Sequence, residues 1–142
     1  MLVSQILKDK GDHVFTASPN ETVAAAAALL HARRVGAMVV VEHGEVVGIL
    51  SERDLVRLVA EGGENALSRP ISHCMTREVI FAHLHETVDM LMTRMTDRRM
   101  RHLPVLESGR LAGIISIGDL VKYKISEIEA EADGLKAYIA AG

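Results

Sequence analysis

The feature that most constrains the fold of this chain is an internal repeat. Residues 14–57 and 79–122 align without gaps at an offset of 65 and share 16 identities in 44 positions. The identities run from Val14 and Val79 to Asp-Leu-Val at 54–56 and 119–121, and they include Glu-Thr-Val at 21–23 and 86–88. A register kept over this length indicates two copies of one structural unit, which we expect to be related by a pseudo-twofold axis.

The repeats set the expected domain boundaries. We expect the first repeat at residues 1–62, a linker at 63–70 bounded by glycines and a proline, and the second repeat at 71–124. Residues 125–142 form a C-terminal helical extension, predicted as part of one long helix from Ser116 with apolar points among charges. Such a helix usually packs on something: its own module, a second copy, or another protein.

Both repeats have the same predicted order of elements. Thr22 and Thr87 carry hydroxyls that can cap the helices predicted at 23–33 and 88–98. Short extended segments at 14–16 and 79–81 precede these helices, β-hairpins with glycine turns follow them, and second helices begin at Ser51 and Ser116. The predicted fold class is α+β, with two β-α-β-β-α repeats forming one module.

Composition excludes several classes of function. A net charge of -3 supplies no basic field, and 3% aromatic residues supply no stacking platform, so we expect no nucleic-acid partner. The longest apolar run, residues 23–30, is too short to span a bilayer, and the N-terminus lacks the apolar core of a signal peptide. A single cysteine, Cys74, allows no internal disulfide, so the expected location is cytoplasmic, without a membrane.

Two strings carry a resemblance to a known family. Gly-Ile-Leu-Ser-Glu-Arg-Asp at 48–54 and Gly-Ile-Ile-Ser-Ile-Gly-Asp at 113–119 resemble the CBS domain pattern of glycine, two apolar residues, serine, two variable residues and aspartate. The strand entrance at 101–105 and the repeat opening at 71–76 resemble the same family. The resemblance covers nearly the whole chain up to about Lys124. It implies a regulatory module rather than an enzyme, with homodimers formed through helices.

The resemblance also implies a site for an adenine nucleotide in a cleft between the repeats. In CBS domains the aspartate of the motif commonly holds the ribose, a role that falls here on Asp54 and Asp119. Ser51 and Ser116 stand where a hydroxyl and the helix N-terminus can meet a phosphate. The expected adenine wall is apolar and lies near either the first or the second repeat's strands: Val14, Phe15, Thr16, Val79, Ile80, Phe81, Leu103 and Pro104.

Each of these assignments has a structural alternative. Serine followed three residues later by aspartate is also a capping-box variant, and capping and binding need not exclude each other. Arg101, His102 and Arg53 are candidate phosphate ligands because arginine makes bidentate contacts to phosphate. Arg98 and Arg99 are better explained as the solvated end of a helix.

Other constellations are weaker. His83-Leu84-His85-Glu86 lacks further residues at metal-ligand spacing, so a polar loop is the preferred interpretation, and no metal is expected. Cys74 aligns with Ile6 and is expected to be a buried apolar side chain. No catalytic constellation or Gly-rich phosphate loop is present, so we expect no enzyme.

The sequence therefore favours a stand-alone regulator that senses an adenosyl ligand and signals to an unknown separate protein. AMP, ADP, ATP, NAD and S-adenosylmethionine all contain the adenosine that the motif addresses, and no obligatory cofactor is expected. The alternative is a dimeric protein-interaction module with empty sites that acts through its C-terminal helix.

Overall fold

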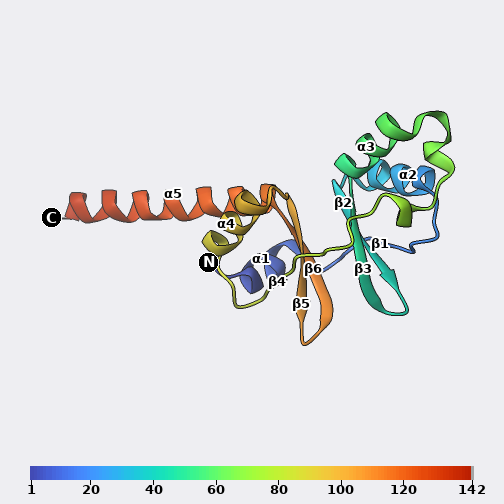
Figure 1. Cartoon of the computed structure of the whole chain (residues 1–142). Coiled ribbons are helices and arrows are strands. Elements are labelled where there is room, and N and C mark those ends of the chain that lie inside the picture. Colours follow the sequence, from blue (N-terminus) through green and yellow to red (C-terminus); the bar gives the residue numbers. More distant parts are fainter. Residues whose placement is uncertain (142) are drawn as a thin grey trace. The chain divides into compact units, whose positions relative to one another are not determined.

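The computed structural model describes residues 1–141, shown as a ribbon in Figure 1. The chain divides into two compact units, one of residues His13–Ile80 and one that joins Met1–Asp12 to the chain from Phe81 onward. Each unit holds one three-stranded sheet with helices, so the fold is mixed α+β, as predicted. No helix within residues 1–141 combines the length and the apolar character needed to cross a bilayer.

The His13–Ile80 unit contains the first sheet, in the order β1-β2-β3. Strand β1 pairs parallel with β2, and β2 pairs antiparallel with β3. The buried core of this unit includes Val23, Leu30, Met38 and Leu50. Its elements are β1 (Thr16–Ala17), α2 (Val23–Arg33), β2 (Ala37–Glu42), β3 (Glu45–Ser51), α3 (Glu52–Gly62) and two 3-10 helices, η1 (Gly63–Ser68) and η2 (Ile71–His73).

The other unit repeats this plan with the sheet order β4-β5-β6. Strand β4 pairs parallel with β5, and β5 pairs antiparallel with β6. The last helix of this unit, α5, is much longer than its counterpart α3, as the sequence predicts. The elements are α1 (Val3–Lys10), β4 (Ala82–His83), α4 (Val88–Arg98), β5 (His102–Glu107), β6 (Arg110–Ser116) and α5 (Ile117–Ala141).

The predicted threonine caps are confirmed. Thr22 accepts a hydrogen bond from the amide of Ala25 at 3.1 Å, and Thr87 accepts one from Met90 at 3.2 Å. The first strands, by contrast, are shorter and begin later than predicted: only Thr16 of residues 14–16 is in β1, and none of residues 79–81 is in β4. The reason is that each of these strands forms just two residue pairs with its neighbour.

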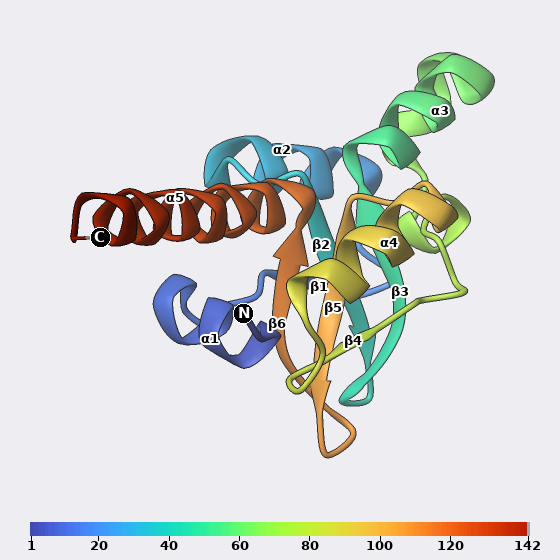
Figure 2. The ribbon, with the colours of Figure 1, turned by 90° about the vertical axis from the view of Figure 1, so that its left-hand side faces the viewer.

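In each unit a segment from outside the sheet packs directly on it at a glycine. In the unit with α1, a Cβ on Gly113 of β6 would lie 2.7 Å from Leu7 Cδ2. In the other unit, a Cβ on Gly48 of β3 would lie 2.6 Å from Met75 Sδ. Figure 2 shows α1 beside β6. The absence of a side chain at these two strand positions is therefore what lets the buried side chains of Leu7 and Met75 reach the sheets.

We expect Gly113→Val to destabilise the protein by about 1–3 kcal/mol, because the added carbons overlap Leu7 in a packed core. The cost should shrink in a Leu7→Ala background, where the space is open. Gly134→Ala is the control: its Cβ would meet nothing within 4 Å, so stability should hold or rise by up to about 1 kcal/mol. Urea unfolding measures all four variants, and an equal cost of Gly113→Val in both backgrounds would contradict this packing.

Candidate functional site

The two Ser-x-x-Asp sequences both sit where the last strand of a sheet turns into a helix. At the start of α3, Asp54 Oδ2 accepts from the Ser51 amide at 2.9 Å, and Ser51 Oγ accepts from the Asp54 amide at 3.4 Å. At the start of α5, Asp119 Oδ2 accepts from the Ser116 amide at 2.9 Å, and Ser116 Oγ accepts from the Asp119 amide at 3.1 Å. Both pairs are capping boxes, which confirms the structural alternative. Binding of a ligand then depends on the acceptor capacity that these hydrogen bonds leave on each carboxylate.

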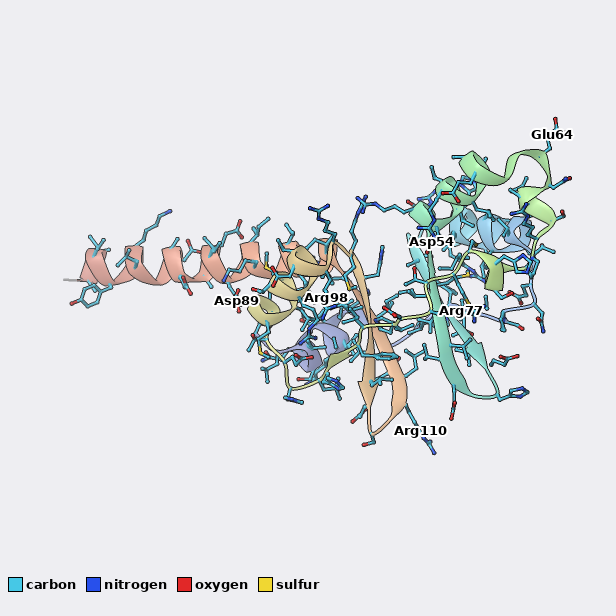
Figure 3. The ribbon with its side chains drawn as sticks, viewed as in Figure 1. Asp54, Glu64, Arg77, Asp89, Arg98 and Arg110 are labelled. Carbon is cyan, nitrogen blue, oxygen red and sulfur yellow. The ribbon has the colours of Figure 1, made fainter. Side chains whose placement is uncertain are left out.

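The Asp54 carboxylate is enclosed, with hydrogen bonds at both oxygens. Its Oδ2 also accepts from Ser51 Oγ at 3.1 Å, while Oδ1 accepts from Arg57 at 2.9 Å and from Thr76 Oγ1 at 3.4 Å. The side chain is only 6% exposed. Figure 3 labels Asp54 at the start of α3. A ligand hydroxyl could reach this carboxylate only by displacing one of these partners.

The Asp119 carboxylate is more open. Its side chain is 22% exposed, and Lys10 at the end of α1 donates to Oδ2 at 2.5 Å. Lys10 also donates to the Ile114 carbonyl at 2.8 Å, which holds the ammonium beside the carboxylate. Burial alone would raise the pKa of Asp119, but hydrogen bonds and charge from Lys10, together with the bonds from Ser116, hold this pKa below its ordinary value. Asp119 is therefore an anion at neutral pH, and the Lys10 ammonium partly covers its carboxylate.

The structure brings Arg101 and His102 to this same helix start. The amide of Ile117, the first residue of α5, donates to the Arg101 carbonyl at 2.8 Å, and His102 pairs with Ser116 across the sheet. At the equivalent place in the other unit, the amide of Glu52 donates to the Gly36 carbonyl at 3.0 Å. The second copy of the site thus has an arginine where the first has a glycine.

The remaining predicted binding residues occupy varied places. Arg53 is exposed in the first turn of α3, next to Asp54 in sequence. Phe15 is half-buried, with the Arg33 guanidinium 5.0 Å from its ring centroid and the ring of His13 edge-on at 4.7 Å. Its neighbours Val14 and Thr16 are half-buried and exposed, respectively.

The adenine wall predicted for the second repeat falls in different parts of the fold. Leu103 and Pro104 are buried in β5 and offer at most their backbone to a ligand. Val79 and Ile80 belong to the His13–Ile80 unit, and Phe81 begins the other stretch of chain. Only Phe81, Leu103 and Pro104 therefore share a compact unit with Asp119.

Sequence reasoning missed a buried ion pair near the predicted polar loop. Glu86 is buried, and Arg94 on α4 donates to both of its oxygens while the His83 amide donates to Oε1 at 2.9 Å. The hydrogen bond from Arg94 is the main reason that the pKa of Glu86 is lowered. Arg94 also donates to the Phe81 carbonyl at 3.0 Å, so this pair fixes the chain entering β4. The sequence gives only a weak indication of this ion pair, because Arg94 is a single arginine eight residues after Glu86.

Cys74 is buried, as predicted, and burial with the nearby Asp54 charge raises the pKa of its thiol. It lies directly before Met75, the residue that packs on β3, and its carbonyl accepts a hydrogen bond from Arg57. Both facts fit a packing role. The rings of His83 and His85 stack at 6.1 Å, and residues 1–141 contain no group of three side chains that could hold a metal ion.

Comparison with curated proteins places the chain among CBS domain proteins. The CBS domain family model matches residues 3–61 and 71–126. A mitochondrial CBS domain-containing protein, CBSX3 of Arabidopsis thaliana, is 34% identical over 99% of this chain and 72% of its own length. CBS domain-containing protein YhcV of Bacillus subtilis is 33% identical over 82% of this chain and 83% of its own.

Solved structures agree with the sequence comparison. The CBS-domain containing protein ATU1752 of Agrobacterium tumefaciens matches with a TM-score of 0.85 and 47% identity, over 87% of this chain and 92% of that one. The CBS domain pair of protein MJ0100, solved in complex with 5'-methylthioadenosine and S-adenosyl-L-methionine, matches with a TM-score of 0.79 and 29% identity, over 89% and 98%. The chain described here belongs to the CBS domain family and is a tandem CBS pair.

Proposed function

We propose that this CBS pair is a regulatory module that binds an adenosine-containing ligand at the start of α5 and passes the signal to a separate protein. The observation that carries the proposal is the partly exposed, ionised carboxylate of Asp119 beside a helix N-terminus and Arg101. A carboxylate in this state can accept hydrogen bonds from both hydroxyls of a ribose.

The proposal favours Asp119 over Asp54 as the ribose ligand. Asp54 is 6% exposed and bonded at both oxygens, so a ligand must break buried hydrogen bonds to reach it. At Asp119 the ligand has to displace or share only Lys10, which is 31% exposed, and an ion pair near the surface contributes about 0–1 kcal/mol. A single occupied site is therefore expected at low ligand concentration.

Positive charge at the same point favours a ligand with phosphate. The backbone of Arg101 is fixed against the first turn of α5, and its exposed side chain can reach outward to an anion. The helix dipole, the Ser116 hydroxyl and Lys10 add to the attraction, with His102 as a neighbour. AMP, ADP, ATP and NAD satisfy this chemistry fully, whereas S-adenosylmethionine would use only its adenosine part.

The related MJ0100 pair supports the choice of ligand class, because it was solved with two adenosyl compounds, 5'-methylthioadenosine and S-adenosyl-L-methionine. We propose that the ligand acts here as a signal rather than as an obligatory cofactor, in a homodimer in the cytoplasm. It would shift an equilibrium between two states of the protein by its difference in affinity for them.

A second candidate function is a protein-interaction module whose nucleotide sites stay empty. The observation that favours it is the long helix α5, on which Ile128, Leu135, Tyr138 and Ile139 are each more than half exposed. A row of exposed apolar side chains on one helix commonly marks a surface that binds another protein. The two functions are compatible, because α5 also begins at the proposed nucleotide site.

We expect Asp119→Asn to weaken binding of the best ligand at least tenfold, because an amide cannot replace the second acceptor oxygen for the ribose hydroxyls. Asparagine still offers one oxygen to the Ser116 amide, so the helix start is kept. Asp54→Asn is the matched control and should change the dissociation constant less than threefold. Isothermal titration with AMP, ADP, ATP, NAD and S-adenosylmethionine measures each variant. Absence of wild-type binding to all five would refute the proposal.

Arg101→Ala should weaken AMP binding about tenfold while leaving 5'-methylthioadenosine, which has no phosphate, within twofold. The reason is that a hydrogen bond to a charged group contributes about 1.5–3 kcal/mol, and only AMP offers the anion. Arg98→Ala serves as control, because Arg98 is exposed in the last turn of α4, where its charge is explained by the helix dipole. Equal losses for both ligands in the same titrations would show that Arg101 acts on the adenosine or on folding instead.

A further inference from the structure

Helix α5 carries a regular apolar stripe that its own unit does not cover. The stripe follows a spacing of four, three, four, three and four residues along the helix. We call it the α5 seam, and it consists of Val121, Ile125, Ile128, Ala132, Leu135 and Ile139. The five large side chains of the seam are between 42% and 68% exposed.

The contacts of α5 with its own unit use a different face. Leu120 is fully buried, the Tyr123 hydroxyl donates to Asp9, and Glu127 binds the N-terminal amino group at 2.7 Å. With 3.6 residues per turn, the seam is centred about 100° around the helix from Leu120. Figure 1 shows the C-terminal part of α5 continuing beyond α1 and α4 of its unit. The large side chains of the seam thus stay partly exposed, and the C-terminal part of the helix that carries them lies clear of α1 and α4.

The spacing of the seam indicates the kind of partner. Alternating steps of three and four residues give a period of 3.5, the a and d positions of a coiled coil, rather than the wider stripe of a helix that packs on a globular core. Ile125, Ala132 and Ile139 take one of the two positions, and Val121, Ile128 and Leu135 take the other. The natural occupant of such a seam is a second helix with the same repeat.

The charges that flank the seam specify a second copy of this chain in parallel orientation. In a parallel pair the g position of one helix meets the e position five residues later on its partner. Lys124 would then meet Glu129, and Glu131 would meet Lys136, so every charged pair is attractive. Within its own chain, Lys124 Nζ forms an ion pair with Asp89 of α4 at 3.0 Å, and the Lys124 side chain is still 35% exposed at the edge of the seam. Figure 3 labels Asp89 on α4.

An antiparallel pair of the same helices would be repulsive. With the seams fully overlapped, e positions meet e positions and g positions meet g positions. Lys122 would then face Lys136, while Glu129 and Glu131 would each face their own copies. Like charges at these positions select against the arrangement, so the same residues that favour the parallel pair disfavour the antiparallel one.

We propose that two copies of this chain join through the α5 seam as a parallel two-stranded coiled coil. The inference deepens the proposed homodimer, on which it rests, by assigning its surface and orientation. Most of the seam lies past residue 126, where the match to the CBS family model ends. Because Ser116 and Asp119 lie at the start of α5, a parallel pair would bring two such helix starts to the same end of the dimer.

The first test is sedimentation equilibrium of the full chain with Ile128→Glu, which places a charge in the middle of the seam. Ala137→Glu is the matched control, because this exposed residue lies on the opposite side of the helix. We expect Ile128→Glu to raise the dimer dissociation constant at least tenfold and Ala137→Glu to change it less than threefold. Circular dichroism confirms that both variants fold, which is expected because both positions are exposed.

The second test fixes the orientation. Lys136→Glu should weaken the dimer, since it sets Glu131 against a glutamate, and Glu131→Lys with Lys136→Glu should restore it. A stronger dimer in the single variant would instead show an antiparallel pair. A wild-type dimer that Ile128→Glu leaves intact would overturn the α5 seam but keep the homodimer, and a wild-type monomer at high micromolar concentration would overturn both. Nucleotide titration of Ile128→Glu reports separately on the ligand site.

Discussion

The junction between the last strand and the last helix of each unit is the feature on which the rest of the structure depends. A serine and an aspartate exchange hydrogen bonds with each other's amides there, which satisfies donors at the helix start that would otherwise lack partners. The same bonds fix the direction of α3 and α5 relative to their sheets. They also hold a carboxylate beside a helix N-terminus. The same serine and aspartate therefore cap the helix and place an acceptor group where a ligand could bind.

The two copies of this junction differ in what surrounds the carboxylate. Arg57 and Thr76 close over Asp54, whereas within residues 1–141 only Lys10 donates to Asp119 from outside its own junction. The second junction also gains Arg101 where the first has Gly36. The duplication therefore supplies two junctions with the same backbone arrangement. A few side chains enclose the carboxylate of Asp54 and leave that of Asp119 more exposed and surrounded by positive charge. In our proposal this asymmetry decides which copy senses the ligand, while the extension of α5 provides the route to a second chain.

Local signals allowed much of the fold to be predicted from the sequence. The threonine caps, the hairpins and the start of α5 all depend on residues within a few positions of one another. Because the sequence is repeated, each of these motifs occurs twice, which strengthened the prediction. The ion pair between Lys10 and Asp119 spans 109 residues and follows from tertiary packing of Leu7 on Gly113, which no local pattern encodes. The buried pair of Glu86 and Arg94 was missed for a related reason: charges in a polar-looking loop carry no sign of burial until α4 covers them.

The central claim is that an adenosyl ligand binds at the start of α5 in preference to the start of α3. Amide chemical-shift mapping tests it most directly, with the isotope-labelled chain titrated with AMP. Our account predicts that the largest shifts fall on residues 116–119 and on Arg101, at AMP concentrations that leave residues 51–54 nearly unmoved. Shifts centred on residues 51–54, or none at millimolar AMP, would contradict it.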